Sequence, residues 1–295
     1  MILKQGDYKV IGTRPVRHDG ADKVTGRAKY GADFHANDIL HAKFVRSPHA
    51  HARILSIDTS EAEAMDGVFA VVIGADLPEV ADEVIALGEG AANLRYLRNN
   101  VLAADKALYK GHAIAAVAAS SPACRRRGRR QDQGEGRRGR GICQADLIVE
   151  REFDTSTVHQ GYIEPQVATG LWNTDDRITI WCSTQGSFSV RDEMVGILSK
   201  PASQIKVVPM EIGGGFGGKI PAYLEPTVAV LSKKSGRPVK AVMTRQEVFE
   251  ATGPTPGSHM KIKAAAHLTI AEANRIRRGG FQTRPWGSPR RYRLG

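Results

Sequence analysis

The feature that most constrains this chain is a glycine-rich loop, Gly213-Gly214-Gly215-Phe216-Gly217-Gly218-Lys219. It follows an apolar run at residues 205–212, which predicts a strand, and precedes residues 221–235, whose pattern predicts a helix. Pro221 suits the first turn of that helix and Gly236 its C-terminal end. Glycines leave the backbone amides bare, and bare amides beside a helix N-terminus favour anions because the helix dipole is positive there. The loop is therefore expected to face an anionic group.

Three interpretations of this loop compete. In the first it is a nucleotide-binding phosphate loop, because Gly213, Gly218 and Lys219 match the first part of GxxxxGK[ST]. However, Ile220 stands where a hydroxyl residue would hold Mg²⁺. In the second the loop is a tight turn without a ligand. In the third it presses its backbone against an anionic, planar cofactor.

The third interpretation gains a specific resemblance from the segment Trp181-Cys182-Ser183-Thr184-Gln185 upstream of GGGFGGK. Together these motifs resemble the molybdopterin-binding large subunit of the xanthine dehydrogenase/aldehyde oxidase family. In that family the glutamine approaches the ligands of molybdenum, and the Gly-Phe-Gly loop borders the metal and the pterin. A glutamine can donate a hydrogen bond to a metal-oxo group without adding charge. The resemblance implies molybdopterin as cofactor, and its cofactor-binding residues here are Gln185, Gly214, Gly215, Phe216 and Gly217.

The resemblance covers residues 11–122 and 145–266, with further motifs at 23–26 (KVTG), 47–54 (SPHAHARI) and 159–165 (HQGYIEP). It implies an α+β fold, with an α/β hammerhead domain over residues 1–122. The N-terminal part of a molybdopterin-binding mixed α/β domain is expected over residues 145–274. Hydrophobic patterning predicts a short helix within 57–70, a helix at 187–198 and strands at 40–45, 68–73, 113–118, 147–153, 168–172, 178–182 and 237–243.

Two unpatterned Arg-rich segments, 123–144 and 275–295, fall outside the resemblance. The net charge of the whole chain is +11. Residues 124–140 and 275–295 carry +6 and +7, so the remaining residues together carry −2. A basic nucleic-acid-binding protein is the alternative that these segments suggest. The favoured hypothesis is a shifted reading frame and a truncated large subunit, inactive alone, with no nucleic-acid partner.

The cysteine spacing limits which cofactors this chain could bind. Cys124, Cys143 and Cys182 show no CxxC spacing, which argues against an iron–sulfur cluster or structural zinc in this chain and fits a reducing compartment. The resemblance implies that electrons leave through partner subunits that carry iron–sulfur clusters and FAD, with no flavin here. No apolar run has membrane-spanning length and no signal-peptide core is visible, so a cytoplasmic location away from membranes is expected.

No catalytic residue is assigned. The family's general base is a late glutamate, and no motif here supplies it. Glu164 could serve as a general base, but the resemblance implies that its Glu-Pro segment is structural. His41, His49 and His51 lack a convincing set of metal ligands, so hydrogen bonding is expected of them instead.

Ile220 bears on the small-molecule substrate. Purine-oxidising members of the family place a glutamate just after the lysine of the loop. Ile220 in that position therefore implies a substrate less polar than xanthine, such as an aldehyde, an aromatic acyl thioester or another heterocycle.

Overall fold

The computed structural model describes residues 12–86, 91–120, 147–253 and 255–266. The Arg-rich segments at 123–144 and 275–295 lie outside these described residues. Contacts divide the described chain into two units. One comprises residues 12–120 and 159–255, and the other comprises 147–158 and 256–266.

Helices and strands are mixed along the chain, which is the predicted α+β class. The strands are β1 (Leu40–Arg46), β2 (Ala52–Arg53), β3 (Val68–Ile73), β4 (Val84–Ala86), β5 (Ala91–Asn93), β6 (Lys106–Ala107), β7 (Ala113–Ala119), β8 (Leu147–Thr155), β9 (Val167–Trp172), β10 (Ile178–Cys182), β11 (Ile205–Pro209), β12 (Val239–Val242) and β13 (Ser258–Ala266). The helices are α1 (Gly20–Thr25), α2 (Ser60–Glu63), α3 (Leu94–Val101), α4 (Ser187–Leu198), α5 (Glu225–Ser235) and α6 (Arg245–Ala251), with 3₁₀ turns η1 (Gly31–Asp33), η2 (Gly74–Asp76) and η3 (Ala202–Gln204).

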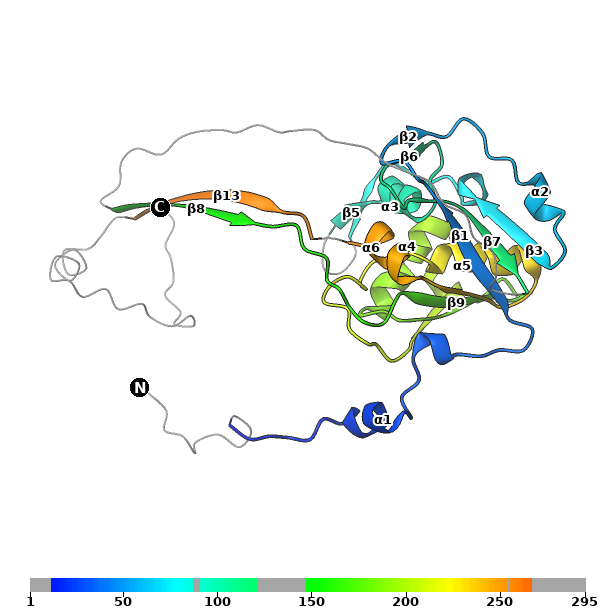
Figure 1. The fold of residues 1–295 in the computed structure, drawn as a ribbon, viewed down its shortest axis with the longest axis horizontal. Coiled ribbons are helices and arrows are strands. Elements are labelled where there is room, and N and C mark those ends of the chain that lie inside the picture. The colour runs from blue at the N-terminus through cyan, green and yellow to red at the C-terminus, as the bar shows by residue number, and fades with distance from the viewer. Residues whose placement is uncertain (1–11, 87–90, 121–146, 254, 267–295) are drawn as a thin grey trace. The chain divides into compact units, whose positions relative to one another are not determined.

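The first unit is built on a seven-stranded sheet in the order β11-β10-β9-β12-β1-β7-β3. The pairs β10–β11 and β1–β12 are parallel, and the other neighbours are antiparallel. Strands β1, β3 and β7 come from the predicted hammerhead segment, whereas β9 to β12 come from the predicted molybdopterin-binding segment. Leu40 lies opposite Val239 where the two sets meet. Figure 1 shows β1, β7 and β3 side by side in this sheet.

Helix α5 packs against β9, β12, β7 and β3, while α4 packs against β11 and α5. Gly170 on β9 permits this approach, because a Cβ there would lie 3.0 Å from the backbone nitrogen of Ala229. Burying these faces supplies the hydrophobic free energy of the fold. Its fully buried side chains include Leu40, Val72, Ile180, Met194, Ile197, Val228, Leu231 and Val239.

The predicted helix at 187–198 is confirmed as α4. The start predicted for the next helix is wrong, because α5 begins at Glu225 rather than at Pro221. Pro226 occupies the first turn of α5, where its missing N–H needs no intrahelical partner. Helices α3 and α6 were not predicted.

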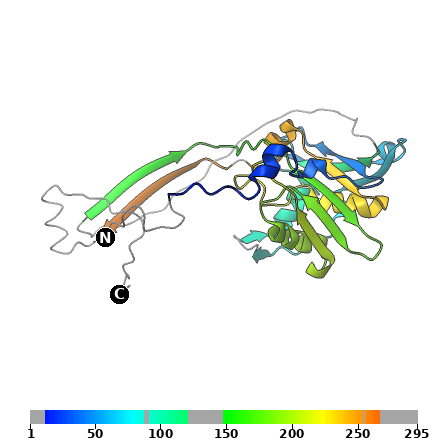
Figure 2. The same ribbon diagram turned by 90° about the horizontal axis from the view of Figure 1, so that it is seen from below.

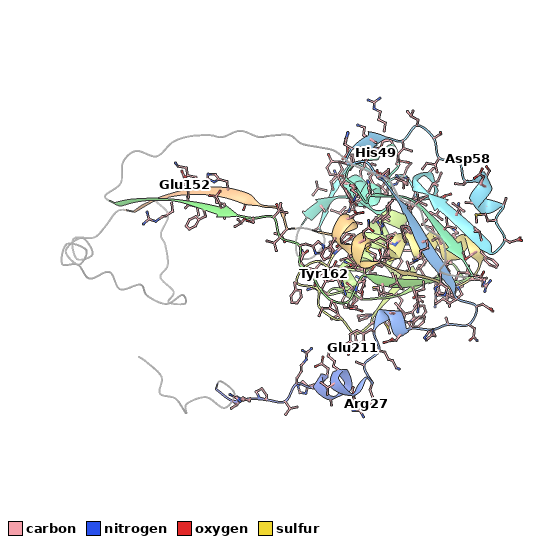
Figure 3. The ribbon with its side chains drawn as sticks, in the orientation of Figure 1. Arg27, His49, Asp58, Glu152, Tyr162 and Glu211 are labelled. Atoms are coloured by element: carbon pink, nitrogen blue, oxygen red, sulfur yellow. The ribbon has the colours of Figure 1, made fainter. Side chains whose placement is uncertain are left out.

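The second unit contains an antiparallel pair, β8 with β13, in which Phe153 lies opposite Met260. Both views show the two strands running side by side (Figures 1 and 2). One face carries cross-strand ion pairs, with Lys261 Nζ 2.6 Å from Glu152 Oε1 (Glu152 is labelled in Figure 3). The other face carries Phe153, Met260 and Ile262, each 41–52% exposed.

Candidate functional site

The glycine loop lies between the end of β11 and the segment that leads into α5. Gly214 and Phe216 adopt positive φ angles of 94° and 51°, whereas Gly215 between them does not. Alternating handedness of this kind is typical of backbone nests that bind anions. Among the described residues, the N–H groups of Gly214, Gly215 and Phe216 have no hydrogen-bond partner. The Phe216 side chain is 74% exposed, so the loop presents one ring beside these amides.

Gln185 holds the loop from the end of β10. Its Oε1 accepts hydrogen bonds from the N–H groups of Gly217 (2.9 Å) and Lys219 (3.2 Å). Because both partners are donors, the amide oxygen faces the loop and Nε2 remains as a donor on an exposed residue. A Cβ at Gly215 would lie only 2.7 Å from Gln185 Cδ, which explains the glycine there. The structure therefore brings the predicted residues Gln185, Gly215 and Gly217 together.

A buried polar chain supports the loop from behind. The hydroxyl of Tyr162, labelled in Figure 3, donates to Gln166 Oε1 at 2.8 Å. Gln166 Nε2 in turn donates to the carbonyl of Gly218 at 3.1 Å. Tyr162 and Gln166 are both almost fully buried, so these hydrogen bonds are shielded from water.

Glu164 and Lys219 form a buried ion pair under the loop. Lys219 Nζ lies 2.7 Å from Glu164 Oε2, and its side chain has no exposed surface. Burial lowers the pKa of Lys219, although the facing Glu164 carboxylate acts to raise it. A phosphate loop needs its lysine to reach the ligand, so this geometry contradicts the nucleotide-binding interpretation. Sequence reasoning did not predict this pair.

Two more carboxyls hold the segment that follows the loop. Glu193 on α4 accepts from the Ala222 N–H at 3.0 Å, and Glu225 accepts from those of Tyr223 and Leu224 at 2.9 Å each. Burial, with the nearby Glu225 carboxylate second, raises the pKa of Glu193 to about 7. Burial, with the nearby Glu225 carboxylate second, also raises the pKa of the Cys182 thiol.

Within the described ranges, no three His, Cys, Asp or Glu side chains gather in a way that could hold a metal ion directly. Any metal at the glycine loop would therefore have to arrive with its own ligands. None of the helices described is long and apolar enough to cross a membrane.

Comparison with known families agrees with this geometry. Residues 123–273 match the molybdopterin cofactor-binding domain, and residues 25–131 match the a/b hammerhead domain of aldehyde oxidase and xanthine dehydrogenase. The chain belongs to the xanthine dehydrogenase/aldehyde oxidase family of molybdenum hydroxylase large subunits.

The chain is also similar to individual proteins of this family. It is 30% identical to the nicotinate dehydrogenase large molybdopterin subunit of Eubacterium barkeri, covering 82% of this chain and 63% of that protein. It is 28% identical to the xanthine dehydrogenase molybdenum-binding subunit of Escherichia coli O157:H7, covering 80% and 36%. The structure of quinoline 2-oxidoreductase from Pseudomonas putida 86 superposes with a TM-score of 0.68 at 26% identity, covering 87% and 37%. The chain thus spans less than two thirds of each relative's length.

Proposed function

We propose that this chain forms part of a molybdopterin-dependent oxidoreductase subunit, with the cofactor held by Gln185 and the loop residues Gly214, Gly215, Phe216 and Gly217. The observation that carries the proposal is the orientation of Gln185. Its oxygen is bound to two loop amides, which leaves Nε2 as a donor on an exposed residue, near three backbone N–H groups that have no hydrogen-bond partner among the described residues.

The donor chemistry fits an anionic cofactor. These groups are all N–H donors, and the Glu164 carboxylate under the loop is paired with Lys219. When bound, the molybdenum cofactor supplies the oxygen transfer and accepts the electrons. Gln185 Nε2 would orient it by donating a hydrogen bond, and the Phe216 ring would cover its edge against water. The proposed partners are iron–sulfur and flavin subunits, which would receive the electrons in the reducing interior of the cell.

The proposed substrate is an aldehyde, an aromatic compound or an N-heterocycle, which the enzyme hydroxylates or oxidises. Ile220, half-buried after the loop, gives this side of the site no charged hydrogen-bonding group. Two of the relatives named above act on nicotinate and quinoline, which are aromatic N-heterocycles.

The test is the variant Gln185→Glu in the full chain, produced in a host that makes the molybdenum cofactor. Glutamate keeps an oxygen that can accept from Gly217 and Lys219, but it replaces the outward donor with a second anionic oxygen. We expect molybdenum and pterin contents to fall about tenfold, since one charge-assisted hydrogen bond is lost. The matched control is Gln246→Glu on α6, which should retain the wild-type content. Equal contents in the two variants would refute the role of Gln185.

A further inference from the structure

One carboxylate oxygen joins the two ends of the glycine loop. Glu164 Oε2 accepts from the N–H of Gly213, the first residue of the loop, at 2.7 Å. The same oxygen lies 2.7 Å from Nζ of Lys219, the last residue. The Glu164 N–H also donates to the Gly213 carbonyl at 3.2 Å. Glu164 therefore fixes the distance between the loop's ends as well as the orientation of its first peptide.

The surroundings bury this junction. The Lys219 side chain is 0% exposed and that of Glu164 is 12% exposed. Lys219 Nζ lies 5.0 Å from the centroid of the Tyr162 ring. Arg245 Nη1 donates to the Tyr162 carbonyl at 2.8 Å, which holds the segment before Glu164 in place. The second oxygen, Glu164 Oε1, is buried and has no hydrogen-bond partner in the described structure.

A buried ion pair is an inefficient way to stabilise a fold. Desolvation of two charges often cancels their attraction, and apolar residues of similar volume commonly stabilise as well or better. A buried ion pair in which one oxygen has no hydrogen-bond partner stabilises the fold even less, because that oxygen has lost its hydrogen bonds to water. Its value here is geometric: two short contacts to one atom define a separation that apolar side chains would leave loose.

We infer that Glu164 and Lys219 are positioning residues that clamp the ends of the loop and so hold the unpartnered amides of residues 214–216 in the arrangement that receives the cofactor. The inference rests on the proposed function of the loop, and it gives Lys219 a role beneath the loop instead of at the ligand. The clamp neutralises its own charge, so attraction for an anion comes from the loop amides and Gln185.

The experiment compares the paired variant Glu164→Leu/Lys219→Met with wild type and with Lys240→Met, all as the full chain. Lys240 is a buried lysine on β12, 5% exposed, whose Nζ donates to the carbonyl of Ala32 in η1 at 2.9 Å. Removing both charges leaves no unpaired buried ion, so the paired variant is expected to fold. Hydrogen exchange of the amides of residues 213–219 is measured first, followed by molybdenum and pterin content.

In the paired variant, exchange at Gly213, Gly217 and Lys219 should accelerate about tenfold, because the loop opens locally. Cofactor content should fall by a similar factor, and Lys240→Met should change neither quantity. Unchanged loop exchange, or equal acceleration in Lys240→Met, would overturn the clamp. Faster exchange with wild-type cofactor content would overturn its role in positioning. Wild-type protein that carries neither molybdenum nor pterin would instead refute the proposed function itself.

Discussion

The glycine loop and the β8–β13 pair are held by opposite kinds of contact. The loop has no regular secondary structure, yet residues of the surrounding unit bind it through Gln185, Gln166 and Glu164. The β8–β13 pair has a regular ladder, but its side chains are largely exposed and its ion pairs face water. Rigidity in this molecule is therefore expected to follow burial of polar contacts rather than regularity of the backbone.

The largest effect should come from breaking the buried pair on one side only. Lys219→Met leaves the Glu164 carboxylate buried without its ion partner, which should lower the free energy of unfolding by about 3–5 kcal/mol. Urea unfolding monitored by circular dichroism measures this change. A loss as small as that of an exposed lysine would show that the loop is not held by the pair.

The next-largest effect depends on pH and concerns Glu193, the buried carboxyl that accepts from the Ala222 N–H after the loop. Its pKa rises from 4.5 to about 7 on folding, chiefly through burial. Between these values the unfolded chain binds fewer protons than the folded chain, so stability falls as pH rises from about 4.5 to about 7. The loss is on the order of 3 kcal/mol. Glu193→Gln should remove it, as unfolding measured at pH 5 and pH 8 would reveal. A pH slope retained in the variant would assign it to other groups.

A smaller effect is expected from Gly215→Ala. The added Cβ would overlap the Gln185 side chain and push it away from Gly217, a form of overpacking that costs about 1–3 kcal/mol. Thermal unfolding measures the loss. Gly20→Ala, whose Cβ would make only ordinary van der Waals contact with Arg17 Cβ at 3.4 Å, serves as a control for substitution at a glycine. Equal losses would mean that the contact with Gln185 is easily displaced.

The smallest effect belongs to the β8–β13 pair. Lys261→Ala removes an ion pair whose side chains are about half exposed, and such pairs contribute about 0.2–1 kcal/mol. For the Lys261→Ala variant, urea unfolding should give nearly the same free energy of unfolding in low and in high salt. A loss approaching that of Lys219→Met would remove the contrast between the two regions.

Local signals made part of this fold predictable. Helix α4 and the β9–β10 hairpin follow from hydrophobic patterning and a short turn, because their partners are close in sequence. Helix α6 also had a local signal that was missed, the capping box in which Thr244 and Glu247 bind each other's backbone N–H. The start of α5 was misplaced because tertiary contacts from Glu193 hold the preceding residues out of the helix.

Within the site, Gln185 and the loop were predicted from motifs, and the structure places them in contact. Their binding of the cofactor remains a prediction. The pairing of Glu164 with Lys219 could not be read from the sequence, because it depends on the path of a loop 49 to 55 residues further along the chain.

The parallel pairing of β1 with β12 has a consequence for how the protein folds during synthesis. Leu40 pairs with Val239, and β12 is the strand that joins β1 to β9. Until residue 242 leaves the ribosome, β1 can bond only to β7, and one edge of that smaller sheet stays open. Such long-range closure slows folding and exposes an aggregation-prone edge meanwhile. Ribosome stalling between β11 and β12 should therefore harm this protein more than stalling after β12.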